Sequence, residues 1–511
     1  MAAGTHLSWN LALAIAVCAP AVVGVAMPAD LTAAEKAPTL TAVPAEVTFT
    51  KHIAPILQRS CQNCHHPQGV APMPLTTYEE VRPWARAIKQ RTGIGPKAGV
   101  MPPWYIEKNI GIQHYKDDPS LSEIEIATVA KWADTGAARG NPSDMPPPLR
   151  FEDGAAWKIG KPDLIVSSKE LLVKGDAADW WGEIESIPLG LTEDRYVAAV
   201  EIKEVNDVPK TGTGRSTVGG RYVFHHMIWS TRVLSEVPEG IELTEALVLG
   251  GNDNVTPWPV HEVGRNADVF DQNAGRLLKA GSSIVSNSVH LHSSGRDTKA
   301  RLDIGFKLHP KGYKPTLRRS PTRQLGNGVD IDIKAMESGQ QLHAYTVLQE
   351  HTKITSFEPH LHAPGARMCL EAIWGFNIQT LSCSGYDHNW VRGYDYEDDH
   401  APLLPRGTIL HIIGYMDNSP SNKNVPDPRN WQGSGNRSVA NMFIDLGMGI
   451  SLTDEQFQQE MMKRREQMQL TQSDVFLGCP LCNVAPRLTP AAPLNTAPAS
   501  PAASATRPPP Q

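Results

Sequence analysis

Five residues near the N-terminus, Cys61-Gln62-Asn63-Cys64-His65, have the spacing of a covalent haem site. In a C-x-x-C-H motif the two thiols add to the vinyl groups of haem, and the adjacent histidine becomes the proximal iron ligand. We therefore predict one c-type haem, attached through Cys61 and Cys64 and ligated by His65. The alternative is a local disulfide followed by an unrelated histidine.

A methionine in a proline-rich loop is the candidate for the sixth haem ligand. Met101 lies in the segment Gly99-Val100-Met101-Pro102-Pro103-Trp104, where prolines stiffen the loop that presents the thioether. A methionine ligand raises the haem potential and suits electron transfer. Met73 and His66 are the competing ligands.

Three histidine groups lie farther along the chain: His225-His226, His290-Leu291-His292 and His360-Leu361-His362. Side chains two residues apart in a strand share a face, so both pairs separated by a leucine can each converge on one ion. The adjacent pair needs a local bulge or different ring nitrogens to do the same. Imidazoles suit copper, zinc or iron. A multicopper oxidase is disfavoured, because no cysteine outside the haem motif is next to a histidine.

The elements that must position these residues change in period along the chain. Residues 48–138 are helical in character, whereas the segments RYVAAVEIKEV, RYVFHHMIWSTRV and TILHIIGYMDN alternate as strands do. We predict a multidomain protein with an N-terminal all-α domain followed by two antiparallel β-sandwich domains. The predicted segments are a signal peptide (1–26), a flexible leader (27–44), the all-α domain (45–148), two β-sandwiches (155–315 and 325–450), and a helix with a disordered Pro/Ala-rich tail (451–511).

The apolar run from Leu7 to Ala26 and its small-residue end predict export to the periplasm or secretion, with no membrane span in the mature chain. An uncleaved anchor is the alternative. An oxidising compartment permits disulfides, which we predict between Cys369 and Cys383 and between Cys479 and Cys482. The formal net charge of -6 gives no basis for nucleic-acid binding.

From about Trp157 to Ile450 the chain resembles the type II copper, ascorbate-dependent monooxygenases, the family of peptidylglycine α-hydroxylating monooxygenase and dopamine β-monooxygenase. The segments that carry the resemblance are YVFHHMIW, AGSSIVSNSVHLH, FEPHLHAPG, YDHNW, GTILHIIGYMDNS and GNRSVANMFI. The front of the chain, with MPPW and WADTGAARGNP, resembles the cytochrome c domain fused to bacterial members.

The resemblance implies two mononuclear coppers facing each other across a solvent-filled cleft between jelly-roll-like sandwiches. The electron-transfer copper takes His225, His226 and His290, with His292 in reserve. The oxygen-activating copper takes His360, His362 and Met442. Ala440-Asn441 stands where family members carry an acidic pair.

The expected function is a copper-dependent monooxygenase that hydroxylates a C–H bond of a small molecule with O₂. The fused haem takes electrons from an external donor and supplies them in place of ascorbate. A non-catalytic redox relay or copper-binding protein is the alternative, and a zinc hydrolase is a third.

Two positions argue against a peptide substrate that ends in glycine. In the peptide-hydroxylating relatives an arginine before the H-x-H pair clamps the substrate carboxylate, and a tyrosine after the copper methionine assists. Here these positions are Glu358 and Leu446. We expect Glu358 to repel a carboxylate, unless it turns to solvent or pairs with an arginine such as Arg367.

Overall fold

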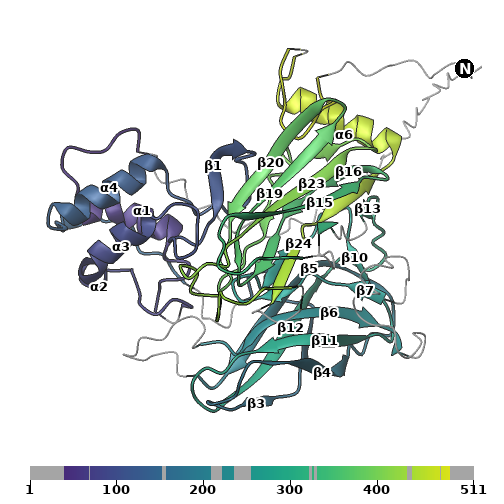
Figure 1. Ribbon diagram of the computed structural model, residues 1–511, viewed down its shortest axis with the longest axis horizontal. Helices are drawn as coiled ribbons and strands as arrows, with labels where there is room; N and C mark the ends of the chain where they lie inside the picture. Colours follow the sequence, from purple (N-terminus) through teal and green to yellow (C-terminus); the bar gives the residue numbers. More distant parts are fainter. Residues whose placement is uncertain are drawn as a thin grey trace, which may run out of the picture. The chain divides into compact units, whose positions relative to one another are not determined.

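The computed structural model in Figure 1 describes most of the chain between residues 40 and 483. The described ranges are 40–67, 69–151, 157–208, 221–234, 255–320, 325–326, 331–433, 435, 440–471 and 473–483. The predicted signal peptide, most of the leader and the tail from 484 lie outside them. Within these ranges no helix is long and apolar enough to cross a membrane.

Short helices fill much of the segment up to residue 144. They are η1 (Phe49–Ile53), α1 (Ala54–Ser60), α2 (Tyr78–Val81), η2 (Arg82–Trp84), α3 (Ala85–Thr92), α4 (Glu123–Asp134) and η3 (Pro142–Asp144). Thr77 and Ser122 begin α2 and α4 with capping boxes, in which side chain and backbone satisfy each other's free N–H groups. α4 falls within the residues 48–138 that the sequence marks as helical in character.

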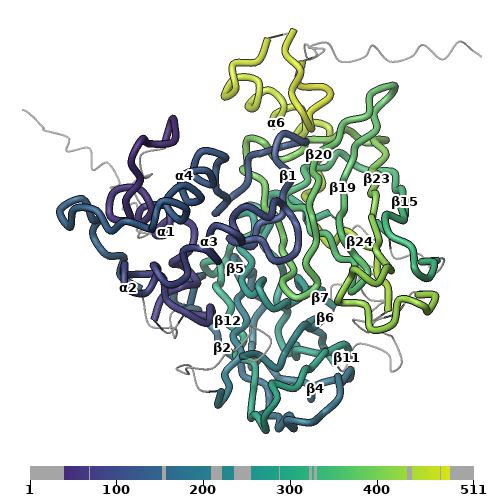
Figure 2. The backbone as a smooth tube through the Cα atoms, turned by 60° about the vertical axis from the view of Figure 1, so that its left-hand side comes forward, coloured from purple at the N-terminus to yellow at the C-terminus, as the bar shows by residue number. Residues whose placement is uncertain are grey.

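The expected all-α domain over 45–148 is wrong. The chain is mostly β-sheet, its helices are short, and the N-terminal segment itself contains the strand β1 (Ile106–Gly111). This strand pairs with β20 (Asn377–Gly385), and the two lie side by side in Figure 2. Trp104 and Ile112 are buried in the same core as the strands around residues 340–416. The helical pattern of this segment gave no sign of the six-residue strand, because the strand packs against residues that lie much later in the chain.

The strands of the described ranges form six sheets, and every pairing is antiparallel. The first contains β1, β20, β19 (Gly365–Trp374), β23 (Ile409–Met416) and β15 (Gln340–Val347). The second contains β10 (Arg276–Leu278), β5 (Arg195–Asn206), β12 (Thr298–Leu308), β2 (Leu164–Ser167), β3 (Leu171–Val173) and β9 (Ala267–Val269).

The third sheet contains His225, His226 and His290, and His292 lies just beyond the end of one of its strands. It contains β4 (Trp180–Pro188), β11 (Ser283–Leu291), β6 (Phe224–Arg232), β7 (Val255–Pro257) and β8 (His261–Glu262). Three smaller sheets remain. One contains β13 (Arg318–Arg319), β25 (Gly449–Leu452), β16 (His351–Ile354) and β22 (Leu403–Leu404), and the next contains β14 (Leu325–Gly326), β24 (Asn441–Asp445) and β18 (Pro359–His362). The last pairs β17 (Ser356–Phe357) with β21 (Tyr394–Asp395).

Two large hydrophobic cores support these sheets. One is built from residues between Val173 and Phe306, and the other from residues between Leu325 and Phe443 together with side chains near Trp104. A smaller core packs against α6 (Asp454–Gln467), the polar helix after the last strand. The described residues from Thr41 onward belong to one compact unit, and the domain boundaries inferred from the sequence stay predictions.

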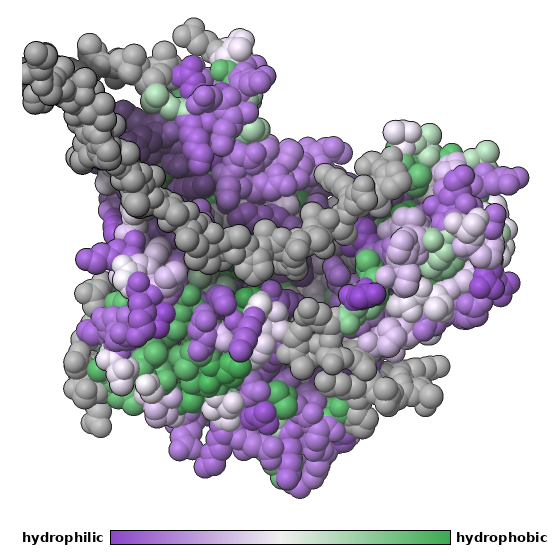
Figure 3. Space-filling view, turned by 180° about the vertical axis from the view of Figure 1, so that it is seen from behind, coloured by the Kyte–Doolittle hydropathy of each residue, from purple (hydrophilic) through white to green (hydrophobic). Residues whose placement is uncertain are grey.

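Both predicted disulfides are confirmed. Cys369 and Cys383 face each other directly across β19 and β20, with Cα atoms 4.1 Å apart. Cys479 and Cys482 close a local loop that is buried against the smallest core. On the face shown in Figure 3 hydrophilic side chains predominate, and hydrophobic ones gather over one part of it.

Candidate metal centre

His225 and His226 lie on β6, where a bulge directs both rings toward one place. β6 pairs with β11 in a register that sets His226 opposite His290 and Phe224 opposite Leu291, which leaves His225 as an extra residue. The Nδ1 atoms of His225 and His226 are therefore only 3.2 Å apart. A bulge was one of the ways in which the adjacent histidines could share a site, and it is present here.

His290 ends β11 with His292 just beyond it, and their rings meet at one point. Their Nε2 atoms are 3.2 Å apart, and two nitrogens bonded to one ion at a tetrahedral angle would be about 3.3 Å apart. Ligand nitrogens of His225, His290 and His292 all lie within 4.8 Å of one another. His292, held in reserve by the sequence argument, thus belongs to this compact group. Asp179 adds a carboxylate oxygen 3.3 Å from Nε2 of His290.

His360 and His362 lie on β18 and face the second candidate ion, with ring centroids 5.0 Å apart. Oε1 of Glu262 is 3.1 Å from Nδ1 of His360, which leaves Nε2 of that ring for a metal. β18 pairs with β24 so that His360 is opposite Ile444. His362 is opposite Asn441, with a register shift between the two pairs, so Met442 lies in the irregular part of β24 beside the H-x-H pair.

The distances between rings divide the histidines into two neighbouring groups. Rings bound to one ion at right or trigonal angles have centroids about 4.5 to 5.5 Å apart. His225, His290 and His292 have ring separations of 4.4, 4.4 and 5.1 Å, which fit one ion. The ring of His226 is 6.3 Å from those of both His360 and His362. The two groups are therefore adjacent among the residues that the structure describes.

Burial keeps these imidazoles neutral. It lowers the pKa of His225 and His226 well below the usual value, and the neighbouring rings lower it further. Burial, with His292 nearby, also lowers the pKa of His290 to about 4. Neutral imidazoles present free lone pairs at physiological pH, which is the form that binds a metal.

Three further residues of this centre were not assigned from the sequence. Asp179 and Glu262 reach histidines that are far away in the chain, and no local pattern marks such contacts. His388 lies in the YDHNW segment with its ring centroid 5.6 Å from that of His225. Burial and the nearby imidazoles, His360 first, lower the pKa of His388 to about 3. Of these three residues, only His388 could have been noticed from the sequence, because it lies in the YDHNW segment.

The haem motif forms a single turn after α1. The backbone N–H groups of Cys64 and His65 both donate to the carbonyl of Cys61, at 3.1 and 2.9 Å. The carbonyl of Met73 lies 2.9 Å from Nδ1 of His65, so Nε2 is left for iron. Neither Cys61 nor Cys64 is in a disulfide, and burial raises the pKa of the Cys61 thiol to about 12. The residues present fit a covalent haem.

Arg392 adds a second observation that fits haem. Its positive charge lies close enough to Cys64 to lower the pKa of that thiol, against the larger upward effect of burial. The guanidinium packs over the ring of Trp104 at 5.4 Å, and its Nε is buried without a hydrogen-bond partner. A haem carboxylate is a suitable partner for such a group.

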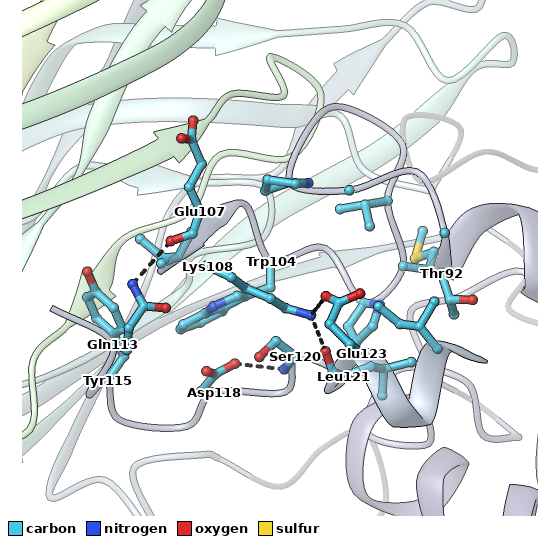
Figure 4. Close-up of a pocket in the computed structure, with 18 of the residues that line it drawn as sticks. Thr92, Trp104, Glu107, Lys108, Gln113, Tyr115, Asp118, Ser120, Leu121 and Glu123 are labelled. Atoms are coloured by element: carbon cyan, nitrogen blue, oxygen red, sulfur yellow. Dashed lines mark hydrogen bonds and ion pairs between the residues drawn. The ribbon is translucent and has the colours of Figure 1, made fainter. Parts of the chain in front are cut away.

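Met101 lies in the wall of a cavity of about 430 Å³ that Figure 4 shows in close-up. Lys108 extends across it to the carbonyl of Leu121 and the carboxylate of Glu123, both at 2.6 Å. The described residues that line this cavity do not include Cys61, Cys64 or His65. The Met101 side chain is 40% exposed. Met101 therefore stays a predicted haem ligand.

The loop that carries Met101 packs against the segment that carries His388. The N–H of Gly99 donates to Oδ2 of Asp387 at 3.2 Å, and the N–H of Gly385 donates to the carbonyl of Tyr105 at 2.9 Å. The carbonyl of Pro96 leaves no room for a Cβ at Gly385, since the two atoms would be 1.9 Å apart. The Met101 loop is thus fixed next to the segment that carries His388.

A separate group of His114, Glu397 and His400 fits a metal poorly. The rings of His114 and His400 are stacked with centroids 3.5 Å apart. Two imidazoles on one ion at that spacing would subtend an angle well below the right angle, which needs about 4.5 Å. Glu397 instead forms ion pairs with these rings, at 3.4 and 3.9 Å.

Glu358 neither faces solvent nor pairs with Arg367, the two alternatives that the sequence left open. Its carboxylate is buried against Arg265, which also binds Asp268 at 2.6 Å. Arg367 pairs with Glu107. The charge of Glu358 is therefore compensated, and direct repulsion of a substrate carboxylate loses its basis.

No known family model matches the chain, and no curated protein resembles it closely enough in sequence to count as a relative.

Proposed function

We propose that this protein is an exported copper-dependent monooxygenase, fed with electrons through a covalent haem. One observation carries the proposal: two adjacent groups of imidazoles, the second of which lies on a strand paired with the strand that carries Met442. Imidazole and thioether together favour copper, because the soft sulfur stabilises Cu(I). The two disulfides support an oxidising compartment, either the periplasm or the exterior.

The residues divide the work between the two groups. His225, His290 and His292 would hold the electron-transfer copper together with His226, whose ring centroid is 5.5 Å from that of His225 and 5.1 Å from that of His290. His360, His362 and Met442 would hold the oxygen-activating copper. When bound, this copper activates O₂ for insertion into a C–H bond of a small molecule. One oxygen atom enters the substrate as a hydroxyl group and the other leaves as water, with uptake of two electrons and two protons.

The positions of the Cys61–His65 motif and of the Met101 loop support a supply of electrons from a haem to the histidine groups. Gly69, four residues beyond His65, accepts a hydrogen bond of 2.8 Å from Nη1 of Arg221, just before the β6 histidines. The Met101 loop is bonded to Asp387, next to His388. A haem held by Cys61, Cys64 and His65 would supply electrons from an external donor to the copper of the first group.

Metal and haem analysis of the full matured chain is the first test. One iron and two coppers per chain, with substrate-dependent O₂ consumption, support the proposal. A redox relay would show the same metals without product, and a zinc hydrolase would work without O₂ or reductant. Cys61→Ala and Cys64→Ala should lose the normal attachment of haem through two thioethers, as mass spectrometry would detect. Absence of copper binding by the wild-type chain would overturn the proposal.

A further inference from the structure

Glu204, near the end of β5, binds the backbone at the point where β6 begins. Its Oε1 accepts hydrogen bonds from the side chain of Asn206 at 2.6 Å and from the N–H of Val223 at 3.0 Å. Its Oε2 accepts from the N–H of Val223 at 3.1 Å and from the N–H of Phe224 at 2.8 Å. Both oxygens face donors, which is the arrangement that an ionised carboxylate satisfies.

Two consecutive N–H groups bonded to one carboxylate mark an irregular stretch of backbone. In a regular antiparallel strand successive N–H groups point to opposite sides, so one acceptor does not serve both. The bulge of β6 follows directly: it lies between Phe224 and His226 and leaves His225 as the extra residue. The directions of these two imidazoles therefore depend on how the chain is held as it enters the bulge.

The same corner also holds the second histidine pair. The carbonyl of Val223 accepts a hydrogen bond from the N–H of His292 at 2.8 Å, while the N–H of Val223 donates to Glu204. Val223 and Phe224 are buried, so their N–H groups need an acceptor from within the protein, and the carboxylate of Glu204 provides it. One carboxylate thus fixes the backbone from which rings of both pairs extend.

We propose that Glu204 is a positioning residue for the first histidine group, which consists of His225, His226, His290 and His292. Its carboxylate holds the start of β6 in the conformation from which these rings converge on one ion. Glu204 acts through the backbone of Val223 and Phe224 and is not a ligand itself. This inference rests on the proposed function only in that a metal ion binds the group.

Replacement of the carboxylate by an amide breaks this arrangement without changing its size. In Glu204→Gln the NH₂ group would face either Asn206 or Phe224, both of which are donors, so one hydrogen bond is lost and two donors oppose each other. Burial raises the pKa of Glu204 to about 7, although its hydrogen bonds lower it. The comparison is therefore made well above that pH, where the wild-type carboxylate is ionised.

Copper binding by the full chain with its haem attached tests the role of Glu204. Cu(II) is added at about one equivalent, which the all-imidazole group should bind in preference to the thioether group. Competition titrations give the affinity, and electron paramagnetic resonance gives the hyperfine pattern of the imidazole nitrogens. Glu204→Gln should weaken binding by about tenfold and shift that pattern. Glu204→Asp keeps the charge but is one methylene shorter, and it should shift the pattern in the same direction to a smaller extent.

Glu201→Gln is the matched control. Glu201 lies on the same strand, is 1% exposed and accepts the N–H of Ile159 at 3.2 Å. Three residues separate it from Glu204, so it faces the other side of the sheet. This variant should lose stability but keep the wild-type copper affinity and spectrum.

Wild-type affinity and spectrum in both Glu204 variants, or equal changes in Glu201→Gln, would overturn the proposal. If Glu204→Gln does not fold, Glu204→Asp decides alone, and an unchanged spectrum there overturns it. A wild-type chain that binds no copper would instead overturn the proposed function.

Discussion

Glu262 and His360 connect the two histidine groups. Oε1 of Glu262 is 3.1 Å from Nδ1 of His360, and the two side chains are 1% and 5% exposed. Glu262 lies on β8 directly opposite His226, whereas His360 lies on β18. One carboxylate therefore orients a ring of the second group from the strand beside the first. Nδ1 of His360 lies next to this carboxylate, which would leave Nε2 of the ring for an ion.

Glu262→Gln should weaken copper binding at the second group by about tenfold, because a neutral amide orients and polarises the His360 ring less well than a carboxylate. Competition titrations of Cu(I) measure this affinity. Glu371→Gln is the matched control, since Glu371 forms a similar pair with Nδ1 of His411 at 2.9 Å, outside the two groups. Equal affinities in wild type and Glu262→Gln would contradict the assignment.

Met442→Ile should selectively lower the affinity for Cu(I) at the His360 group and abolish hydroxylation, while the haem is still reduced. The reason is that the thioether favours the reduced ion and the branched alkyl chain offers no donor atom. X-ray absorption of the reduced protein would show the loss of the sulfur scatterer. Met448→Ile serves as control, because Sδ of Met448 already accepts a hydrogen bond from Arg276. Unaltered copper spectra at both groups would remove Met442 from the site.

The sequence predicted features that depend on local spacing. Both disulfides were predicted from the positions of cysteines in one hairpin and in one short loop. It failed where a short segment joins a distant one. The strand β1 is stabilised by β20, more than 250 residues away, so its own segment gives little sign of it.

The same limit applies to the candidate centre. Spacing marked the three histidine groups, but Glu262, Asp179 and His388 join them only through the tertiary fold. The adjacency of the two groups was also not foreseen, because it depends on how separate sheets pack rather than on the register within any strand. The arginine partner of Glu358 was not foreseen for the same reason, since Arg265 is 93 residues away in the chain.

Met101→Ala should remove the sulfur-to-iron absorption band while haem stays attached, if the loop reaches the iron once haem is bound. Met73→Ala is the control. It removes the competing thioether but keeps the backbone carbonyl that lies 2.9 Å from Nδ1 of His65. Visible spectra of the oxidised proteins distinguish the two methionines. Loss of the band in Met73→Ala alone would assign the ligand to Met73.

Glu358→Gln should lower the free energy of unfolding by about 3 kcal/mol, because it removes the charge that compensates a buried arginine. Glu358 and Arg265 are 1% and 9% exposed. Asp398→Asn is the comparison, since Asp398 and Lys116 are 74% and 49% exposed, and loss of that pair should cost less than about 1 kcal/mol. Urea titrations followed by circular dichroism give both values. Equal losses would show that burial of Glu358 contributes nothing special.

Peptides that end in glycine should be poor substrates. The position before the H-x-H pair holds Glu358, and its carboxylate already occupies Arg265 together with Asp268. No guanidinium is thus left at this position to bind a substrate carboxylate bidentately, and a neutral or cationic small molecule fits better. Copper-loaded, reduced protein should hydroxylate a glycine-extended peptide no faster than the same peptide with a C-terminal amide, which lacks the carboxylate. A strong preference for the free carboxylate, at rates typical of an enzyme, would show that Arg265 or another cation rearranges to clamp it.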